Sequence, residues 1–274
     1  MLTSPWPSGE SALSRLFSRF LARVVPWHPK PDFLGIGVQK GGTTTLYNVL
    51  RKHQEVFLTD EKEVHYFTNH FDRRLSWYLA KFRGRKNATV SGEITPYYIF
   101  HPAAPWRIHR FNPSMKLILL LRDPVERAVS HYHHAVRWGL ETLPLADALD
   151  AEDERLADSE ETLSEPGSCH YSHQHHSYAA RSRYELQIAN YLRKFSPEQI
   201  LVLQSERFFL AGAETLARIC AFLGIADFGR EVLLPRSNEG ESATGNLDRK
   251  VAGFLREKLE PTYASMERCY GFHW

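Results

Sequence analysis

Residues 33–47 read Phe-Leu-Gly-Ile-Gly-Val-Gln-Lys-Gly-Gly-Thr-Thr-Thr-Leu-Tyr, an apolar run followed by two glycines and three threonines. This order is typical of a β-strand, a phosphate-binding loop and the N-terminus of a helix. Gly37 and Gly42 have the spacing of the first half of the Walker A pattern, but Thr43 stands where that pattern has its lysine. The lysine of this stretch is Lys40, two residues before Gly42. The loop is therefore predicted to bind phosphate differently from the loop of an ordinary ATPase.

The chemistry of the loop supports this prediction. Two adjacent glycines, Gly41 and Gly42, allow a left-handed backbone and the close approach of a ligand. The free N–H groups and the dipole at a helix start attract an anion, to which threonine hydroxyls add donors and Lys40 adds a charge. The alternative is a glycine turn that only joins a strand to a helix, but such a turn needs neither the lysine nor the threonines.

A second motif lies in residues 116–132, which read Lys-Leu-Ile-Leu-Leu-Leu-Arg-Asp-Pro-Val-Glu-Arg-Ala-Val-Ser-His-Tyr. The apolar run 117–121 predicts a strand that is buried on both faces of a parallel sheet. Arg122 lies at the carboxyl end of this strand, where open α/β sheets bind ligands. Asp123 and Pro124 predict the cap and the first residue of a helix. Arg122 and Ser130 are candidates for binding one phosphate group, through a guanidinium fork and a hydroxyl.

Together the two motifs resemble those of the sulfotransferase family, and the resemblance extends over residues 32–225. In that family the lysine loop holds the 5′-phosphosulfate of 3′-phosphoadenosine 5′-phosphosulfate (PAPS), and the segment R-D-P-x-x-R-x-x-S-x-Y holds the 3′-phosphate. The resemblance implies PAPS as donor, 3′-phosphoadenosine 5′-phosphate (PAP) as product, and Lys40 as a catalytic cation. The residues that it assigns to the donor are Gln39, Lys40, Gly41, Gly42, Thr43, Thr44, Thr45, Arg122 and Ser130, with Arg249 added from a polar segment, residues 236–250, that often closes over the nucleotide in the family.

Two shorter segments resemble the heparan-sulfate and related carbohydrate sulfotransferases. Residues 62–67 read Lys-Glu-Val-His-Tyr-Phe and resemble K-E-x-x-F-F, in which the glutamate is the usual candidate base and the histidine helps in some members. The resemblance therefore makes Glu63 and His65 candidate catalytic residues. Residues 92–98 resemble G-E-K-[ST]-P-x-Y, but Ile94 stands where many heparan-sulfate enzymes have a catalytic lysine. This difference argues against a glycosaminoglycan acceptor and leaves the donor site unaffected.

Glu63 and His65 also have simpler interpretations. In an extended segment their side chains would point the same way, within reach of an acceptor proton. Glu63 could instead only form an ion pair with Lys62 or an arginine, and His65 could be a packed histidine. Glu93 is expected to hold a loop in place. The histidine-rich segment 169–176 has no C-x-x-C partner, so we expect a loop that contacts the acceptor and no metal ion.

Elsewhere, apolar runs that alternate with helical patterns predict one α/β domain with a P-loop-type, mainly parallel sheet that helices cover on both faces. Residues 31–274 are expected to form this sulfotransferase domain, after an N-terminal amphipathic extension at residues 1–30. The predicted strands are 56–58, 89–93, 117–121 and 200–204. The predicted helices are 44–52, 76–82, 104–111, 125–138, 145–158 (acidic and exposed), 183–195 and 214–223, and residues 247–269 are expected to carry the terminal helices.

Composition limits the class of protein. The chain has 274 residues, enough for one large core, and a net charge of only +2, which gives no basic field for nucleic acid. Three cysteines favour a reducing compartment, and no apolar stretch has the length of a membrane span, so a cytoplasmic bacterial enzyme is expected. Residues 11–25 form a basic amphipathic helix pattern, which predicts either packing on the domain or peripheral contact with an anionic membrane.

The sequence thus predicts a PAPS-dependent sulfotransferase that transfers a sulfuryl group in line to a hydroxyl or amine of a carbohydrate, a glycolipid or a small metabolite. Two alternatives remain open at this point. One is a P-loop nucleotide kinase or NTPase, against which the missing Walker lysine argues. The other is a nucleotide-binding protein that has lost catalysis, which Ile94 leaves open and the intact Lys40 and Glu63 disfavour.

Overall fold

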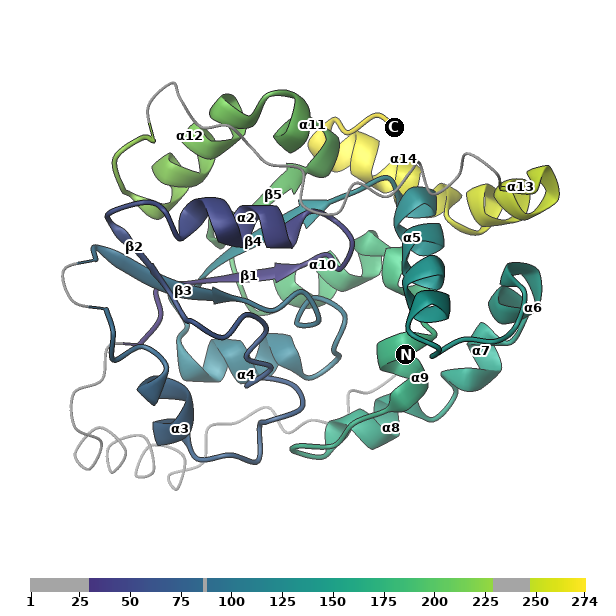
Figure 1. Ribbon diagram of the computed structural model, residues 1–274, viewed down its shortest axis with the longest axis horizontal. Coiled ribbons are helices and arrows are strands. Elements are labelled where there is room, and N and C mark those ends of the chain that lie inside the picture. Colours follow the sequence, from purple (N-terminus) through teal and green to yellow (C-terminus); the bar gives the residue numbers. More distant parts are fainter. Residues whose placement is uncertain (1–29, 86–87, 229–246) are drawn as a thin grey trace.

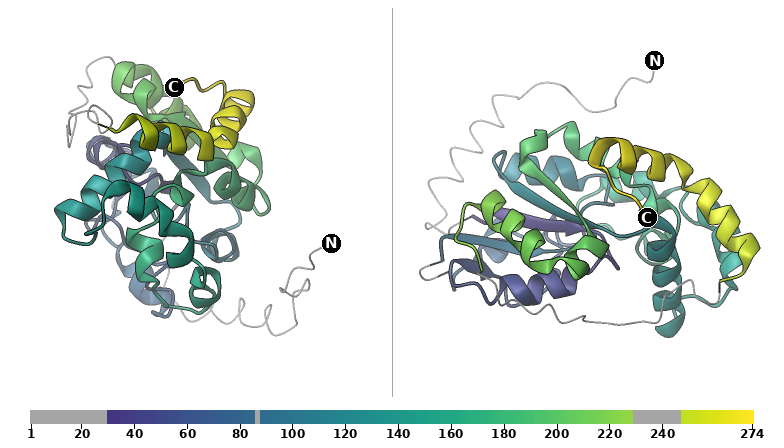
Figure 2. Two further views of the ribbon diagram at one scale, coloured as in Figure 1. Left: turned by 90° about the vertical axis from the view of Figure 1, so that its right-hand side faces the viewer. Right: turned by 90° about the horizontal axis from the view of Figure 1, so that it is seen from above.

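In the computed structural model, which describes residues 30–85, 88–228 and 247–274, the chain forms a parallel β-sheet with helices on both faces (Figures 1 and 2). The strands of this described part are β1 (Phe33–Gly37), β2 (Val56–Leu58), β3 (Val90–Ile94), β4 (Lys116–Leu121) and β5 (Ile200–Gln204). Their order in the sheet is β2-β3-β1-β4-β5, and every neighbouring pair is parallel. The predicted α/β class with a central parallel sheet is confirmed.

Burial explains why the neighbouring strands β1 and β4 are almost entirely apolar. All five residues of β1 are buried, as are the last five residues of β4. Successive side chains of a strand point to opposite faces, so Leu34 and Leu119 join the apolar cluster on one face, while Phe33 and Leu120 join the cluster on the other. Because β1 and β4 are parallel neighbours, the segments that follow them meet at the carboxyl edge of the sheet.

The helices cover the sheet in two layers and extend beyond its end. Figure 1 shows α2 and α12 on one side of the sheet and α4 on the other, with α5 standing at the carboxyl edge beside α6–α9 and α13. The helices are α2 (Thr43–Leu50), α3 (Leu75–Ala80), α4 (Ala104–Phe111), α5 (Pro124–Arg137), α6 (Leu145–Asp150), α7 (Glu152–Arg155), α8 (Ser159–Ser164), α9 (Tyr171–His175), α10 (Tyr184–Leu192), α11 (Ser205–Leu210), α12 (Gly212–Leu223), α13 (Arg249–Lys258) and α14 (Glu260–Tyr270), with 3-10 turns η1 (Ala180–Ser182) and η2 (Pro197–Gln199).

Two predictions about the segment between α5 and α10 are wrong. Residues 145–158 do not form one exposed helix, because the helical pattern is interrupted at Ala151, between α6 and α7. Glu152 is fully buried, and its carboxylate accepts hydrogen bonds from the backbone N–H groups of Ala179 and Ala180, at 2.9 and 2.7 Å. The histidine-rich segment, expected as a loop, contains the short helix α9, which His170 caps by accepting a hydrogen bond from the His173 N–H.

Several predictions lie wholly or partly outside the described residues. The amphipathic pattern at 11–25 and most of the extension at 1–30 are among them, so membrane contact and the division into 1–30 and 31–274 stay predictions. No helix in the described ranges is both long enough and apolar enough to cross a membrane. Within the same ranges, no group of three or more His, Cys, Asp or Glu side chains could hold a metal ion.

Candidate active site

The glycine loop after β1 has the backbone of an anion-binding site. Lys40 and Gly42 both adopt left-handed conformations, with φ of 71° and 92°. Gly42 is the N-cap of α2, and no side chain caps the helix there, which is the arrangement of an anion-binding helix N-terminus. A Cβ at Gly41 would lie 2.6 Å from the carbonyl oxygen of Leu120 in β4, which is too close for any residue but glycine. The predicted strand–loop–helix arrangement is confirmed.

The three threonines of the loop differ in their exposure. Thr43 and Thr45 are buried, at 5% and 0% exposure, while Thr44 is half-buried. Thr43 and Thr45 therefore belong mainly to the core, and Thr44 is the threonine of the loop that is most exposed to a ligand. Ser205, the first residue of α11, donates a hydrogen bond from its hydroxyl to the Gly41 carbonyl at 2.8 Å. This contact fixes the loop to the segment that follows β5.

Basic side chains gather around Lys40. Burial lowers the pKa of Lys40, and the positive charges of Arg137, Arg122 and Arg127 lower it further. The three arginines come from the motif at 116–132 or from the helix that continues it. This is expected if the loop and that motif bind one ligand together. Repulsion among like charges is unfavourable in the absence of an anion, so the cluster is suited to a ligand with several negative charges.

Arg122 follows β4 directly, as predicted, and lies next to the loop. One guanidinium nitrogen donates to the Lys40 carbonyl at 3.5 Å, and another to the Glu126 carboxylate at 2.9 Å. Asp123 caps α5 by accepting a hydrogen bond from the Glu126 N–H, and its second oxygen accepts one from the Tyr263 hydroxyl at 2.8 Å. The C-terminal helix α14 thus braces the start of α5. Ser130 lies on α5 and is half-buried.

Arg249 is the first residue of α13 and is exposed. Asp248 caps this helix, which packs against α5. The residues before it, 229–246, lie outside the described ranges, so the role of Arg249 in binding the donor stays a prediction.

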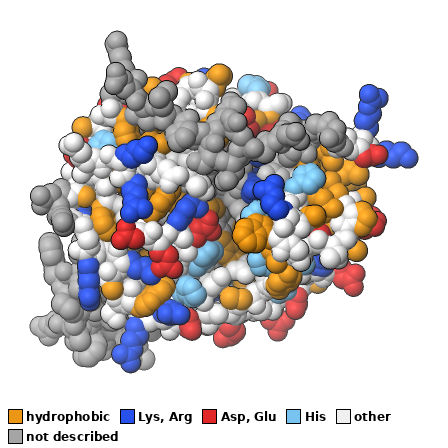
Figure 3. Space-filling view, viewed as in Figure 1, with side chains coloured by type: hydrophobic (Ala, Val, Ile, Leu, Met, Phe, Trp, Pro, Cys, Tyr) orange, Lys and Arg blue, Asp and Glu red, His pale blue; other side chains and the backbone are white. Residues whose placement is uncertain are grey.

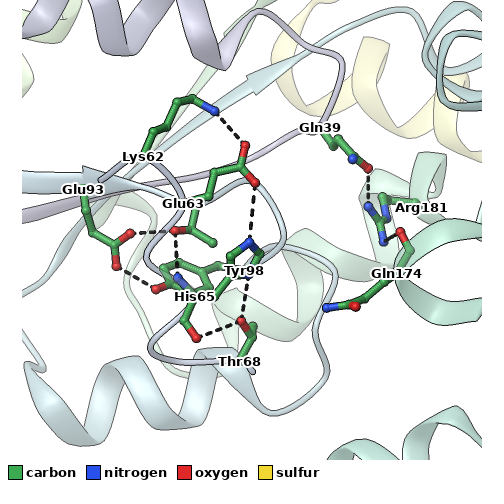
Figure 4. A network of polar contacts seen from close by, with 10 residues as sticks. Gln39, Lys62, Glu63, His65, Thr68, Glu93, Tyr98, Gln174 and Arg181 are labelled. Carbon is green, nitrogen blue, oxygen red and sulfur yellow. Dashed lines mark hydrogen bonds and ion pairs between the residues drawn. The ribbon is translucent and has the colours of Figure 1, made fainter. Parts of the chain in front are cut away.

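Glu63 and His65 meet, but not for the predicted reason. The segment is not extended, because both residues have left-handed backbones, with φ of 64° and 54°. Glu63 Oε2 lies 3.5 Å from His65 Nε2, and Glu63 Oε1 accepts a hydrogen bond from Lys62 Nζ at 2.7 Å. His65 Nδ1 lies 3.2 Å from the Thr68 hydroxyl. Figure 4 shows this continuous chain of polar contacts from Lys62 through Glu63 and His65 to Thr68.

The environment of Glu63 favours its charged form. Burial alone would raise its pKa, but the contacts and charges of His65 and Lys62 outweigh burial and lower the pKa to about 2. The ion pair with Lys62, which was the simpler interpretation of Glu63, is therefore present. A carboxylate with so low a pKa holds a proton weakly, so any role of Glu63 in taking a proton depends on its partners.

Glu93 supports this segment from the end of β3. Its buried carboxylate accepts hydrogen bonds from the hydroxyls of Tyr78, Tyr98 and Thr95, at 3.2, 2.6 and 2.6 Å. Burial raises the pKa of Glu93, although the three hydrogen bonds oppose that shift. Thr95 in turn accepts a hydrogen bond from the His65 N–H at 3.4 Å. The expectation that Glu93 holds a loop in place agrees with these contacts.

Glu63 and His65 line a cavity of about 380 Å³ that extends from the loop to α5 and α9. Figure 3 shows histidine and basic side chains around a hollow in this face of the molecule. The residues that line the cavity are Gln39, Glu63, His65, Asn69, Pro96, Tyr97, His131, His134, Ala135, Trp138, Leu140, Gln174, His175 and Arg181. Of the predicted site residues, the cavity thus brings together Gln39, Glu63 and His65.

Sequence reasoning missed most of the cavity wall. The part of the wall on α5 could have been found from the sequence. Its lining residues have the spacing i, i+3, i+4, i+7, which places them on one helix face: His131, His134, Ala135 and Trp138. No local signal identified Arg181, whose guanidinium donates a hydrogen bond to the Gln39 side chain, 142 residues away in the sequence.

Ile94, which stands at the lysine position of the resembled motif, is fully buried. Its side chain packs against Gly35 of β1, where an added Cβ would lie 2.8 Å away, and it belongs to the apolar cluster under α2. Its side chain therefore takes part in core packing and does not line the cavity.

Comparisons with known proteins identify the family of the chain. The sequence profile of the sulfotransferase domain matches residues 30–235. A membrane-associated sulfotransferase, kil1, from Dictyostelium discoideum is 40% identical over 111 residues, which are 39% of this chain and 24% of kil1. Human heparan sulfate glucosamine 3-O-sulfotransferase 3B1 is 28% identical over 221 residues, which are 80% of this chain and 51% of that enzyme. The chain therefore spans between about a quarter and a half of the length of these relatives.

A solved structure extends the similarity to the whole fold. The sulfotransferase from Alicyclobacillus acidocaldarius superposes with a TM-score of 0.73 and 25% identity, covering 90% of this chain and 98% of that protein. A sulfotransferase domain from the curacin biosynthetic pathway shares the fold at 14% identity, with a TM-score of 0.52. Because the domain profile covers most of the chain and includes the loop, the cation cluster and the Glu63 segment, the chain belongs to the sulfotransferase family.

Proposed function

We propose that the chain transfers a sulfuryl group from PAPS to a hydroxyl or amine of a carbohydrate, a glycolipid or a small metabolite. The observation that carries this proposal is the position of the cation cluster around Lys40, next to a cavity that contains the Glu63–His65 pair. The cluster suits a donor with several negative charges, and the cavity offers room for an acceptor beside it. Membership of the sulfotransferase family supports the reaction class.

The residues of the loop fit the donor. The packing of the protein itself requires glycine at both positions, because a Cβ at Gly41 would lie 2.6 Å from the Leu120 carbonyl oxygen and a Cβ at Gly42 would lie 2.9 Å from the Phe209 ring. The N–H groups at the start of α2 and the Lys40 ammonium would bind the 5′-phosphosulfate end. Arg122 and Ser130, on the neighbouring strand end and helix, would bind the 3′-phosphate. When bound, PAPS supplies an activated sulfuryl group with a phosphate leaving group.

Within this arrangement Lys40 stabilises negative charge on the leaving oxygen, by analogy with the cations of phosphoryl-transfer sites. The proton of the acceptor passes to the Glu63–His65 pair, which lines the same cavity. Glu63 holds His65 through the contact to Nε2, and Thr68 holds the other ring nitrogen. The proton goes to His65 Nδ1, which must first exchange its contact with the Thr68 hydroxyl for one with the acceptor. Because Lys62 and His65 keep Glu63 charged, the carboxylate then stabilises the positive charge of the imidazolium through Nε2.

A P-loop kinase or NTPase fits the site less well. The residue at the Walker lysine position, Thr43, is 5% exposed, and the lysine of the loop lies upstream with a left-handed backbone. An inactive nucleotide-binding protein is a further alternative, against which the hydrogen-bonded and cavity-facing Glu63–His65 pair argues.

The proposal is tested by transfer of radiolabelled sulfate from PAPS to a panel of carbohydrate, glycolipid and phenolic acceptors, with release of PAP as a second readout. Wild type is expected to label at least one acceptor, and Lys40→Ala to lower the rate by more than about a hundredfold, the effect of removing one group that stabilises the transition state. Binding of PAP without transfer to any acceptor would favour the inactive protein instead.

A further inference from the structure

Arg181, in the 3-10 turn η1, is a buried cation in the wall of the cavity. Its side chain is 2% exposed, and it forms no ion pair with a carboxylate in the described part of the chain. The guanidinium donates to the Gln39 side-chain oxygen and to the carbonyl oxygens of His173 and Gln174, the latter two at 2.6 and 3.0 Å. The Nε–H group is buried and has no hydrogen-bond partner among the described residues. Charged groups are seldom buried in this way unless an opposite charge compensates them.

The position of Arg181 points to the ligand that would compensate it. The residue lines the cavity, and its guanidinium lies over the rings of Tyr97 and Phe100, at 5.1 and 4.9 Å from their centroids. Figure 4 shows Arg181 with Gln39 and Gln174 on one side of the view and the Glu63–His65 pair on the other. An acceptor in the cavity can therefore approach the Glu63–His65 pair with one end and Arg181 with the other.

The rest of the cavity agrees in charge and in polarity. Glu63, the one carboxylate among the described lining residues, is already paired with Lys62 and His65. Two other lining residues have buried side-chain atoms, Asn69 Oδ1 and His131 Nδ1, that form no hydrogen bond within the described part of the chain. Unsatisfied atoms of this kind are rare in native proteins and often mark groups that a ligand or water completes.

The positive charge of Arg181 acts throughout this region. Burial lowers the pKa of Arg181 itself to about 9, so the guanidinium remains charged at neutral pH. Burial, and then the charge of Arg181, lower the pKa of His175 and also that of His173, the latter to about 2. A cavity with this field attracts an anion and disfavours a cation.

We propose that Arg181 is a specificity-determining residue, which selects acceptors that carry a carboxylate or sulfate group near the hydroxyl or amine to be sulfated. The guanidinium would form charge-assisted hydrogen bonds with that group through Nε and the free N–H of Nη1. The inference rests on the proposed sulfotransferase function and deepens it. Arg181 would bind the anionic group of the acceptor, whereas Lys40 and Arg122 are proposed to bind the anionic groups of the donor.

The test compares two glycosides that differ in one carboxylate, methyl β-D-glucuronide and methyl β-D-glucoside, by calorimetric titration into the PAP-loaded protein. Wild type is expected to bind the glucuronide at least about tenfold more tightly than the glucoside, which is the gain in affinity that one charge-assisted hydrogen bond contributes. Arg181→Gln should abolish this preference, and Arg181→Lys should retain part of it. Arg183→Gln, two residues away and outside the cavity lining, is the matched control and should behave as wild type.

The outcomes separate the two proposals. If PAP does not bind to wild type, the sulfotransferase proposal fails, and this inference fails with it. If PAP binds but the two glycosides bind equally, or neither binds, Arg181 does not select an anionic acceptor. A loss of PAP affinity in Arg181→Gln would assign the residue to the donor and would also overturn the inference. If Arg181→Gln does not fold, as judged by thermal unfolding, the wild-type preference and its reduction in Arg181→Lys decide the question.

Discussion

The substitution Gly41→Ala tests the geometry of the loop most sharply. An alanine Cβ would lie 2.6 Å from the Leu120 carbonyl oxygen and 2.8 Å from a methyl group of Val38, whereas ordinary contacts begin at 3.4 Å. Leu120 belongs to the central strand and also accepts a hydrogen bond from the Val38 N–H at 2.9 Å, so the strand cannot give way. The loop must therefore move by about 0.8 Å, at a cost of about 1–3 kcal/mol in the free energy of unfolding.

Both stability and donor binding should fall. In a domain of this size the cost corresponds to a decrease of roughly 2–12 °C in melting temperature. The displaced N–H groups and Lys40 should lose at least one charge-assisted hydrogen bond, which weakens PAP binding by at least about tenfold. Gly253→Ala is the matched control, because a Cβ there meets nothing within 4 Å on α13, and it should raise stability by up to about 1 kcal/mol. Unchanged melting temperature and PAP affinity in Gly41→Ala would refute the reasoning.

Three further predictions concern single carboxylates and one apolar residue. Hydrogen bonds from Arg155, two backbone N–H groups and Tyr178 outweigh burial and lower the pKa of Glu141 from 4.5 to about 2. Glu141→Gln should therefore cost about 2–3 kcal/mol at pH 7, and the difference from wild type should shrink as the pH falls from 4.5 toward 2, as measured by denaturant unfolding. Glu63→Gln should lower the rate constant of sulfuryl transfer by about 10²–10⁴-fold with little change in PAP affinity; a wild-type rate with a normal pH profile would remove Glu63 from the mechanism. Ile94→Lys should cost about 3–5 kcal/mol and not raise activity, because a charge at this core position would have no partner.

The sheet could be predicted well because its strands are marked by their own residues. The runs at 56–58 and 200–204 and the helix at 104–111 have the predicted bounds, since each is an apolar or amphipathic segment limited by turn residues. The helix at 145–158 was wrong in two respects, its continuity and its exposure. The burial of Glu152 depends on two backbone N–H groups that lie 27 and 28 residues away, and a local pattern carries no trace of such contacts.

The candidate site shows the same limit. Motifs were enough to bring Lys40 and Arg122 to one edge of the sheet, because parallel neighbouring strands end there. Strand alternation was expected to point Glu63 and His65 the same way, but the two side chains contact each other because both residues have a left-handed backbone, which is uncommon outside glycine. Arg181 was not singled out, since its importance comes from burial and from a long-range contact with Gln39.

The central claim is that the loop and the Arg122 motif bind PAPS, and calorimetric titration of PAP tests it most directly. Wild type, Lys40→Ala and Arg122→Ala are compared, with ATP–Mg²⁺ as the competing ligand. The account predicts that PAP binds to wild type, that Arg122→Ala weakens the affinity by at least about tenfold through loss of a guanidinium–phosphate contact, and that ATP–Mg²⁺ binds far more weakly. Preference for ATP–Mg²⁺, or no binding of PAP, would contradict it.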